Sequence, residues 1–579
     1  MSGKIKNNPS IHQIRHSAAH LTAAAVIKMF PNTKLAIGPV IDDGFYYDVL
    51  TPEPLSESDL VIIEKEAQKL IDQNLDFICS NSSISEARTA LIDQPFKLEI
   101  VEELEKSGAK EVSFYTSGDF VDLCEGPHVN NSGTIKGFKL LTLAGAYWRG
   151  NENNPMLTRI YGTAFHTDKE LTDYLEMREQ AKLRDHRTLG KKLELFDLTP
   201  DIGLGLPVWL PNGATVRRIL DNLVFDLEVK NGYQHVYTPA LGNLNLYKTS
   251  GHYPHYADTM FPEIKVEKET YLLRPMNCPS HIAVYQFKPR SYRDLPLKIS
   301  EAGQVHRYEK SGELTGLSRV REFTINDSHI FTSEETLKIE IQNTLDQIIQ
   351  FLQIVGLTPD IFELALHDKN DKKYIKDENM WNKAENILRE VLKERGVDFR
   401  EEVGGAAFYG PKIDVFAKDV LGREFAISTS QVDHHMPKAF DLNFINSNGQ
   451  KERPVIIHRA IIGSFERFFA FLTEHYAGAF PLFLAPIQFQ IIPISEKFLS
   501  YADEISTQLT QRNYRTSISS SSQTMGDSIR SATEAKIPYM LILGQNEQES
   551  KTVSVRARDG SQSNLVTLES LLKSINEQN

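Results

Sequence analysis

Two pairs of chemically active side chains stand out before residue 130. His16 and His20 lie four apart in HSAAH, and Cys124 and His128 lie four apart in CEGPH. Residues four apart share one face of a helix, and the Ala-rich surroundings of the histidine pair favour a helix. These four soft ligands could bind zinc tetrahedrally. The same side chains could instead transfer protons, or the histidines could simply pack in a core.

A segment in the middle of the chain, PLKISEAGQVHRYEKSGELTGLSRVREFTINDSHIF, carries side chains suited to a nucleotide. Arg307 and Glu309 end a predicted strand, and Arg319 and Phe323 lie on a predicted returning strand after a loop that contains Gly and Ser. Antiparallel strands would bring these side chains over one surface. There, an Arg can grip an α-phosphate, a Glu can accept from an exocyclic amine and a Phe can stack on a purine. A surface hairpin with paired charges is the alternative interpretation.

Two further segments predict helices with a possible binding role. HRAIIGSFERFFAFLTEHY places Gly463 and Ser464 before Glu466 and Arg467 at the start of an amphipathic helix. An Arg at that end suits an anion, because a helix N-terminus already favours negative charge. LPNGATVRRILDNLVFDLEVKNGYQHVYTPAL predicts a long helix and then a strand that ends at Pro239. The apolar positions of this segment fit a dimer interface and an internal core equally well.

The elements that must position these residues divide the chain into several parts. At 579 residues and 65.7 kDa the chain exceeds what one core organises, so three or four domains are expected. Residues 1–170 predict an α+β domain, and residues 171–192 predict one charged helix, which could be a solvated linker or a basic strip that faces RNA. Residues 190–480 contain long strands. The last hundred residues alternate strand and helix, which predicts an α/β domain with a largely parallel sheet.

Composition excludes several classes of protein. With 41% hydrophobic and 24% charged residues, the chain has the composition of an ordinary globular protein. It contains no signal-peptide pattern and no apolar run of the roughly 18 to 20 residues that span a bilayer, so we expect a cytoplasmic location and no membrane partner. Three scattered cysteines without paired spacing argue against a disulfide framework. A net charge of −13 gives no global attraction to nucleic acid, although local basic patches can still bind it.

The motifs together resemble a known enzyme family. The helix and strand ending at Pro239, the Arg307-Tyr308-Glu309 hairpin and the Gly-Ser-Phe-Glu-Arg helix resemble the three motifs of class II aminoacyl-tRNA synthetases, in that order. The blocks RPMNCPSH, SYRDLP, NDSHIF, YGPKID and IIHRAIIGSFERF resemble the threonyl-tRNA synthetases over essentially the whole chain. The resemblance implies a bacterial type that lacks the small N-terminal domain. It implies an α+β editing domain (1–170), a linker helix (171–188), a class II catalytic domain with an antiparallel sheet and flanking helices (189–481) and an α/β anticodon-binding domain (482–579).

The resemblance also implies a reaction: threonine and ATP form threonyl-adenylate, and threonine then passes to tRNA. Arg307 is expected to stabilise the α-phosphate, Arg467 the γ-phosphate, and Phe323 to stack on adenine, with Mg²⁺ neutralising the remaining charge. Glu309 and Arg319 complete the expected ATP site. Class II organisation further implies a homodimer. No DNA partner is expected.

Zinc and threonine recognition are implied in the same way. By resemblance, the zinc ligands are Cys278, His329 and His458, whose spacing alone is not a metal signature. A zinc that takes the amino group and the hydroxyl of threonine rejects valine, which apolar packing distinguishes poorly. The residues expected around threonine are Asp327 and Tyr409 for the amino group, Gln431 for the hydroxyl and Met276 for the pocket wall.

Serine lacks only a methyl group, which gives discrimination on the order of 10- to 200-fold, so a second, hydrolytic site is expected. The N-terminal domain resembles the proofreading domain of bacterial threonyl-tRNA synthetases, which implies metal-free hydrolysis of seryl-tRNA. His16, His20, Cys124 and His128 are expected to position and deprotonate a water. Lys97 and Tyr115 are expected to steady the substrate, and Asp122 lies in the same segment.

Some positions depart from the family pattern. Ile325, Asn326 and Ala426 stand where bacterial members commonly show Gln, Asp and Gln, so nucleotide contacts are either supplied differently or weaker. Glu125 replaces a common Arg and is in doubt as a tRNA-facing position. In the C-terminal domain, Glu549 and Arg558 match positions that read anticodon bases, with a surface ion pair as the alternative. A synthetase-like RNA-binding regulator and a trans-acting aminoacyl-tRNA deacylase are the alternative functions.

Overall fold

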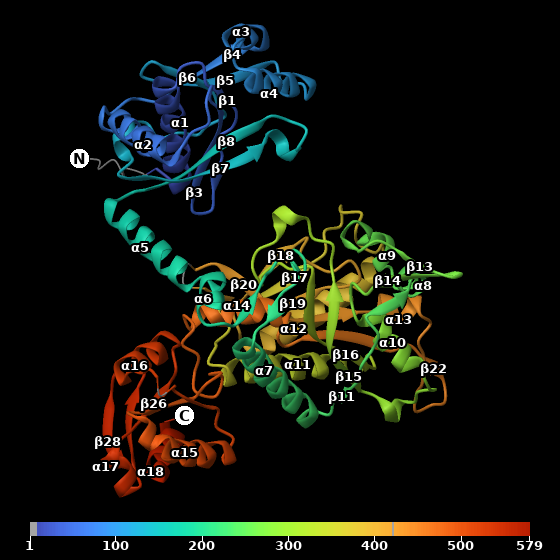
Figure 1. Ribbon diagram of the computed structural model, residues 1–579. Helices are drawn as coiled ribbons and strands as arrows, with labels where there is room; N and C mark the ends of the chain where they lie inside the picture. Colours follow the sequence, from blue (N-terminus) through green and yellow to red (C-terminus); the bar gives the residue numbers. More distant parts are fainter. Residues whose placement is uncertain (1–8, 420–421, 521, 579) are drawn as a thin grey trace, which may run out of the picture. The chain divides into compact units, whose positions relative to one another are not determined.

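The computed structural model describes residues 9–419, 422–520 and 522–578, and it divides into two compact units between Glu179 and Gln180 (Figure 1). Among the described residues, no helix combines the length and the apolar character needed to cross a membrane. The predicted domain boundaries within and between these units stay predictions.

The first unit is an α+β structure built on an antiparallel sheet with strand order β1-β3-β8-β7. These strands are β1 (Lys34–Leu35), β3 (Gly44–Leu50), β8 (Met156–Phe165) and β7 (Gly137–Tyr147), and β2 (Val40–Ile41) pairs with β3. Two helices, α1 (Ile11–Met29) and α2 (Glu57–Asp72), pack on the sheet and share its core. Helix α1 begins at a capping box in which the Ser10 hydroxyl accepts from the Gln13 amide, which fixes the register of HSAAH.

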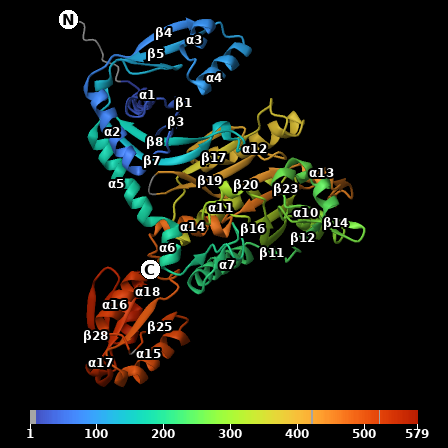
Figure 2. The same ribbon diagram turned by 45° about the horizontal axis from the view of Figure 1, so that its top comes forward.

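A smaller sheet in the same unit carries the cysteine segment. It consists of β4 (Ile78–Ser83), β5 (Glu111–Ser117) and β6 (Phe120–Leu123), with α3 (Ile84–Ala90) and α4 (Pro95–Lys106) beside it (Figure 2). The segment that follows β6 runs back to α1, so CEGPH meets HSAAH.

The linker is two helices rather than one. Helix α5 (Asp168–Arg184) ends before Asp185, and α6 (His186–Lys192) starts after it (Figure 1). The prediction of a single helix over residues 171–192 is therefore wrong. The physical reason is a cap: the carboxylate of Asp185 accepts from the backbone N–H of Arg187 and begins a new helix.

The second unit centres on an eight-stranded sheet with the order β11-β15-β16-β23-β20-β19-β17-β18. All pairings are antiparallel except the outermost two. The strands are β11 (Gln234–His235), β15 (Leu297–His306), β16 (Glu322–Thr332), β17 (Ile361–Leu366), β18 (Phe399–Val403), β19 (Lys412–Lys418), β20 (Glu424–Asp433) and β23 (Val455–Ala460). Five helices contribute to its core among the described residues: α6, α7 (Pro211–Lys230), α11 (Leu337–Ile354), α12 (Glu378–Arg395) and α14 (Phe465–His475).

Smaller elements surround this sheet. They are β9 (Phe196–Asp197) with β10 (Val208–Trp209), the sheet β12 (Leu241–Asn243), β14 (Glu269–Leu273) and β13 (Ile264–Val266), the helices α8 (Leu244–Thr249), α9 (His252–His255), α10 (Cys278–Gln286) and α13 (His435–Ala439), and β21 (Phe444–Ile445) with β22 (Lys451–Glu452).

Strand β16 sorts its residues between the two faces of the sheet. Phe323, Asp327 and His329 lie on the open face, whereas Asn326 and Ile330 point toward the helices. This alternation follows from the period of two in a strand. The open face therefore carries the candidate chemistry, and the helix face carries the structural core.

The C-terminal part has a mixed sheet, β25-β24-β26-β27-β28. Its strands are β24 (Phe489–Pro493), β25 (Thr516–Ile518), β26 (Tyr539–Leu543), β27 (Val553–Ala557) and β28 (Gln562–Val566), with helices α15 (Leu499–Gln511), α16 (Met525–Glu534), α17 (Gln545–Ser550) and α18 (Leu568–Gln578). Strand β24 is parallel to β25 and β26, but β27 is antiparallel to both of its neighbours. The prediction of a largely parallel sheet is wrong for the β26-β27-β28 half of this sheet, because the connections on either side of β27 are too short for a crossover.

Candidate functional site

One cavity of about 360 Å³ collects the side chains expected to bind ATP and threonine. It lies on the open face of the large sheet, between the loop at residues 307–321 and the start of α14. All nine residues expected there line it: Arg307, Glu309, Arg319, Phe323, Arg467, Met276, Asp327, Tyr409 and Gln431. Residues far apart in the sequence therefore share one site, because β16, β23 and β20 are adjacent strands.

The end of the cavity formed by the 307–321 loop and the start of α14 is rich in positive charge. The guanidinium of Arg307 lies 5.1 Å from the ring centroid of Phe323 and makes no ion pair among the described residues. Glu309 accepts from Nε of Arg319 at 2.9 Å. Burial lowers the pKa of Arg307 and of Arg467, and neighbouring Arg319 lowers that of Arg467 further. Two arginines that line the cavity with so little local countercharge, Arg307 partly buried and Arg467 exposed, favour a bound anion.

At the end of the cavity where threonine is expected, one hydrogen bond joins two predicted residues and another comes from Asn277, which the sequence did not single out. The Tyr409 hydroxyl donates to Oε1 of Gln431 at 2.7 Å. Asn277 donates from Nδ2 to Oδ2 of Asp327 at 3.1 Å. Burial raises the pKa of Asp327, an effect that a bound cationic amine would offset.

Cys278, His329 and His458 meet beside that end. Their ligand atoms all lie within 4.8 Å of one another, and all three side chains are buried. Cys278 is the first residue of α10, while His329 and His458 are direct cross-strand partners on β16 and β23. Cross-strand pairing explains why distant sequence positions converge.

Hydrogen bonds orient both histidines toward one point. His281 donates from Nε2 to Glu301 at 3.2 Å, so its Nδ1 accepts from Nδ1 of His329 at 2.8 Å. His458 donates from Nε2 to Asp433 at 2.9 Å. The remaining nitrogens, Nε2 of His329 and Nδ1 of His458, then present lone pairs to each other. Metal-binding histidines are oriented by such partners, so this donor set fits a metal ion.

His281 was missed from the sequence. It is buried, and burial with neighbouring histidines keeps the pKa of His329 well below its usual range, so the His329 imidazole is neutral. Burial also raises the pKa of the Cys278 thiol. The available signal was the three-residue spacing of Cys278 and His281 within NCPSH, which places both on one side of a helix.

The positions that depart from the family pattern separate in the structure. Ile325 and Ala426 line the cavity. Asn326 faces the opposite side of the sheet, where it donates to Oε1 of Glu228 at 3.0 Å and accepts from the backbone N–H of Ile461 at 3.2 Å. Asn326 therefore belongs to a buried structural network and not to the nucleotide cavity.

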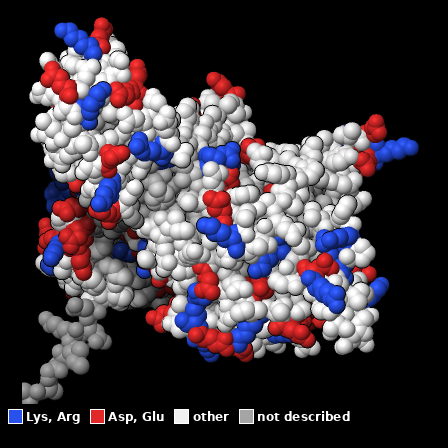
Figure 3. All heavy atoms as spheres, turned by 90° about the horizontal axis from the view of Figure 1, so that it is seen from below, with Lys and Arg blue, Asp and Glu red and all other residues white. Residues whose placement is uncertain are grey.

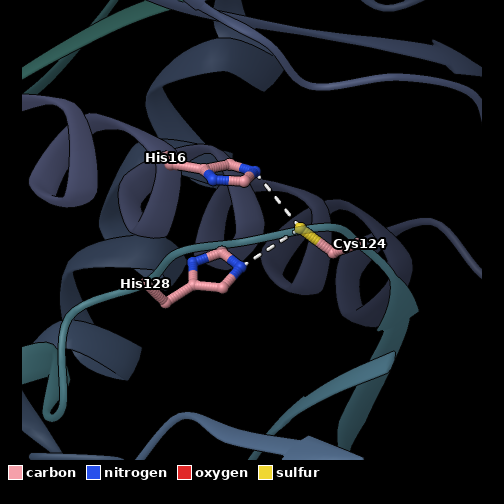
Figure 4. Close-up of side chains that lie close together, drawn as sticks. All are labelled: His16, Cys124 and His128. Atoms are coloured by element: carbon pink, nitrogen blue, oxygen red, sulfur yellow. Dashed lines mark hydrogen bonds between the residues drawn. The ribbon is translucent and has the colours of Figure 1, made fainter. Parts of the chain in front are cut away.

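In the first unit, three of the four candidate ligands converge (Figure 4). Nε2 of His16 and Nε2 of His128 each lie 3.2 Å from Sγ of Cys124. The rings of His16 and His128 stack with centroids 4.4 Å apart. His20 turns its ring toward Phe120 instead, with centroids 4.8 Å apart.

Burial keeps this cluster neutral. It lowers the pKa of His20 to about 3 and of His128 to about 2, and it lowers that of His16 as well. It raises the pKa of Cys124 to about 11, so the sulfur is a thiol near pH 7. At these pKa values the imidazoles are neutral but only weak bases near pH 7, and the thiol is a poor nucleophile, so the cluster is better suited to positioning a water than to deprotonating it.

The remaining editing candidates flank the cluster. Lys97 pairs with Asp122 at 2.9 Å, and both side chains are buried. The hydroxyl of Tyr47, a residue that the sequence did not single out, donates to Asp122 at 2.6 Å. The ring of Tyr115 lies 4.4 Å from that of His128, centroid to centroid. Glu125 is exposed beside them.

The two anticodon candidates differ in environment. Glu549 is exposed on α17 and accepts from Gln545 at 2.8 Å. Arg558 follows β27 and donates to the carbonyls of Phe480 and Lys536, both at 3.0 Å. Glu549 and Arg558 therefore have other partners and do not form an ion pair with each other. Basic and acidic side chains are intermixed over the face drawn in Figure 3.

Comparison with known proteins gives three domain matches. Residues 261–476 match the tRNA synthetase class II core domain (G, H, P, S and T), and residues 488–578 match an anticodon binding domain. Residues 112–161 match the threonyl and alanyl tRNA synthetase second additional domain.

Curated relatives match nearly the full chain. A threonine–tRNA ligase of Anoxybacillus flavithermus is 46% identical over 566 residues, covering 97% of this chain and 88% of that protein. One of Streptococcus pneumoniae is 47% identical over 567 residues, covering 97% and 87%.

Two solved structures each match about two thirds of this chain. A Cryptosporidium parvum structure, described as the RNA binding domain of threonyl-tRNA synthetase, has a TM-score of 0.64 at 36% identity and covers 68% of this chain and 98% of that one. A putative threonyl-tRNA synthetase from Aeropyrum pernix has a TM-score of 0.59 at 28% identity, covering 68% and 95%.

Proposed function

The chain belongs to the threonine–tRNA ligases, class II aminoacyl-tRNA synthetases, and from that premise we propose which of its residues carry each step. The protein joins threonine to tRNA with ATP and Mg²⁺, and its additional domain provides editing. A regulator without activity would need no charged ATP cavity, and a stand-alone deacylase would need no class II core. The alternatives are therefore disfavoured.

Activation of threonine is assigned to the cavity of the large sheet. Arg307 stabilises the charge that develops on the α-phosphate when the threonine carboxylate attacks it in line, and Arg467 binds the γ-phosphate. Phe323 stacks on adenine, and Glu309, oriented by Arg319, accepts from the exocyclic amine. The observation that carries this proposal is the convergence of all nine expected residues on one cavity.

Threonine recognition is assigned to the adjoining histidines and cysteine. We assign zinc to Cys278, His329 and His458, because two imidazoles and one thiol with an open position form the donor set of a working zinc. Bound zinc would supply a Lewis acid for the amino group and hydroxyl of threonine. Asp327 and Tyr409 bind the amino group, Gln431 lies on the hydroxyl side, and Met276 forms the wall. Metal analysis that finds one zinc per chain supports this assignment together with metal-free editing, whereas two would contradict the latter.

Editing is assigned to the cluster around Cys124. Ser17 accepts from the Val129 amide at 3.0 Å, so its hydroxyl is free to donate to Nδ1 of His128 at 3.1 Å. The ring of His128 then donates from Nε2 to Cys124, and the thiol donates to His16.

This ordering holds neutral imidazoles next to the place where a water would attack the ester of seryl-tRNA. His20 backs the cluster, the Lys97–Asp122 pair and Tyr115 shape it, and no metal is required. A His16→Ala/His20→Ala double variant should lose hydrolysis of seryl-tRNA but keep threonine activation. Normal clearance of seryl-tRNA by that variant would contradict the assignment.

Assembly and RNA contacts complete the proposal. Phe225 and Val229 on α7 are 46% and 50% exposed, and Tyr237 is 94% exposed, beside a cavity of about 710 Å³. This apolar exposure supports a homodimer through the α7–β11 segment. Glu549 is proposed to contact anticodon bases. Arg558 is proposed to stabilise the anticodon-binding surface through its hydrogen bonds to the carbonyls of Phe480 and Lys536. A cytoplasmic location fits a tRNA substrate and stays a prediction.

A further inference from the structure

His186, the first residue of α6, bonds to two different elements of the ATP site. It is 4% exposed. Its Nε2 accepts from the backbone N–H of Leu317 at 3.1 Å. An imidazole that accepts at Nε2 carries its proton on Nδ1, so Nδ1 donates to Oε1 of Glu474 at 2.6 Å. Both nitrogens are thus used in hydrogen bonds, which accounts for the proximity of Asp185, His186 and Glu474 without a metal.

The two partners of His186, Leu317 and Glu474, belong to the two elements that carry arginines of the cavity. Leu317 belongs to the 307–321 loop, which joins Arg307 to Arg319 and lines the cavity. Glu474 lies near the end of α14, and Arg467 lies in the first turn of the same helix. The next loop residue, Ser318, accepts from Nε of Arg467 at 3.3 Å. One buried imidazole therefore fixes the loop against the helix.

Close packing supports a positional role. Gly316 has φ +50°, and a Cβ added there would lie 2.1 Å from Nε2 of His186. Leu317 is buried. The loop therefore rests directly on the imidazole, and only glycine at position 316 allows this approach.

We propose that His186 is a positioning residue for ATP: it holds the 307–321 loop in the conformation that binds the nucleotide. The proposal rests on the assignment of ATP to this cavity. Because His186 is the first residue of α6, the second of the two linker helices, it also ties the loop to the linker.

Steady-state ATP–pyrophosphate exchange on the full-length protein tests the proposal. His186→Phe keeps a ring and removes both hydrogen bonds, and Gly316→Ala leaves His186 intact but forces the loop away. Loss of one or two buried hydrogen bonds predicts a rise in the ATP KM of roughly 3- to 30-fold in both variants. The threonine KM and the hydrolysis of seryl-tRNA should not change. His186→Gln, whose amide oxygen can accept from Leu317, should recover part of the loss, and exposed Lys191→Ala on the same helix is the matched control.

Three results would overturn the proposal: an unchanged ATP KM in both variants, an equal rise in the ATP and threonine KM values, or a lower unfolding temperature with normal kinetics. Arg307→Ala separates this failure from that of the ATP assignment. If Arg307→Ala abolishes exchange while the His186 and Gly316 variants behave as wild type, only the positioning role fails. If Arg307→Ala is also normal, the assignment of the cavity fails.

Discussion

Nε2 of His329 lies 2.9 Å from Nδ1 of His458 across the β16–β23 pair. Hydrogen bonds from His329 to His281 and from His458 to Asp433 turn a lone pair of each ring toward the other. Two facing lone pairs repel each other unless a proton or a cation lies between them. Cys278 completes the arrangement from the start of α10. This relationship is the basis for assigning zinc to the three residues.

The orientation of His329 depends on His281. His281→Ala removes the acceptor for Nδ1 of His329, so the ring can rotate or change tautomer. Zinc affinity should fall on the order of 10- to 100-fold, as is usual when the partner of a metal-binding histidine is lost. Competition with a chromophoric chelator measures this. Partly buried His166→Ala, which is neither a proposed zinc ligand nor a partner of one, offers a control, and equal zinc affinity for wild type and His281→Ala would refute the role.

Of the departures from the family pattern, only those in the cavity should affect ATP. Ile325→Gln should change the ATP KM, because position 325 lines the cavity. Asn326→Ala should leave the ATP KM unchanged and lower the unfolding temperature, because it removes hydrogen bonds to buried Glu228 and to Ile461. The opposite pattern in kinetics and thermal unfolding would show that the faces of β16 are assigned wrongly.

The thiol of Cys124 should resist alkylation. Its pKa of about 11 leaves little thiolate at pH 7.5, whereas Cys79 is exposed on β4 and serves as an internal control. Brief treatment with iodoacetamide followed by mass spectrometry should label Cys79 well before Cys124. Labelling of Cys124 at the rate of Cys79 would mean that the cluster holds a thiolate.

Acid should destabilise the first unit. The pKa of folded His20 is about 3 and that of folded His128 about 2, below the ordinary value near 6.5 that applies in the unfolded chain. The unfolded state therefore binds more protons below about pH 6.5, and the free energy of unfolding falls from there toward pH 3. Neither group contributes to this effect above pH 7.

His20→Leu tests the linkage, because neither ring nitrogen of His20 has a hydrogen-bond partner among the described residues. The variant should be at least as stable at pH 7.5 and should lose about one proton of uptake between pH 6.5 and 3. Calorimetric unfolding across this range gives the slope. An unaltered slope would place a protonated His20 in the folded unit.

The convergence of most of the residues expected to bind ATP was predictable from sequence because they are close together along the chain. Arg307, Glu309 and Phe323 lie on one hairpin, whose strands and loop have clear sequence signals. His329 and His458 were not predictable from spacing, since only the pairing of β16 with β23 brings them together, and the resemblance alone indicated them.

Other features needed the tertiary structure. The side of β16 that Asn326 faces depends on register. The helix break at Asp185 arises from a cap that competes with a continuous charged helix.

Threonine-dependent ATP–pyrophosphate exchange with the zinc-loaded, full-length protein tests the central claim most directly. We predict exchange with threonine, little with valine, and loss of exchange in Arg307→Ala and Cys278→Ala. The absence of exchange with threonine, or equal exchange with threonine and valine, would contradict the account.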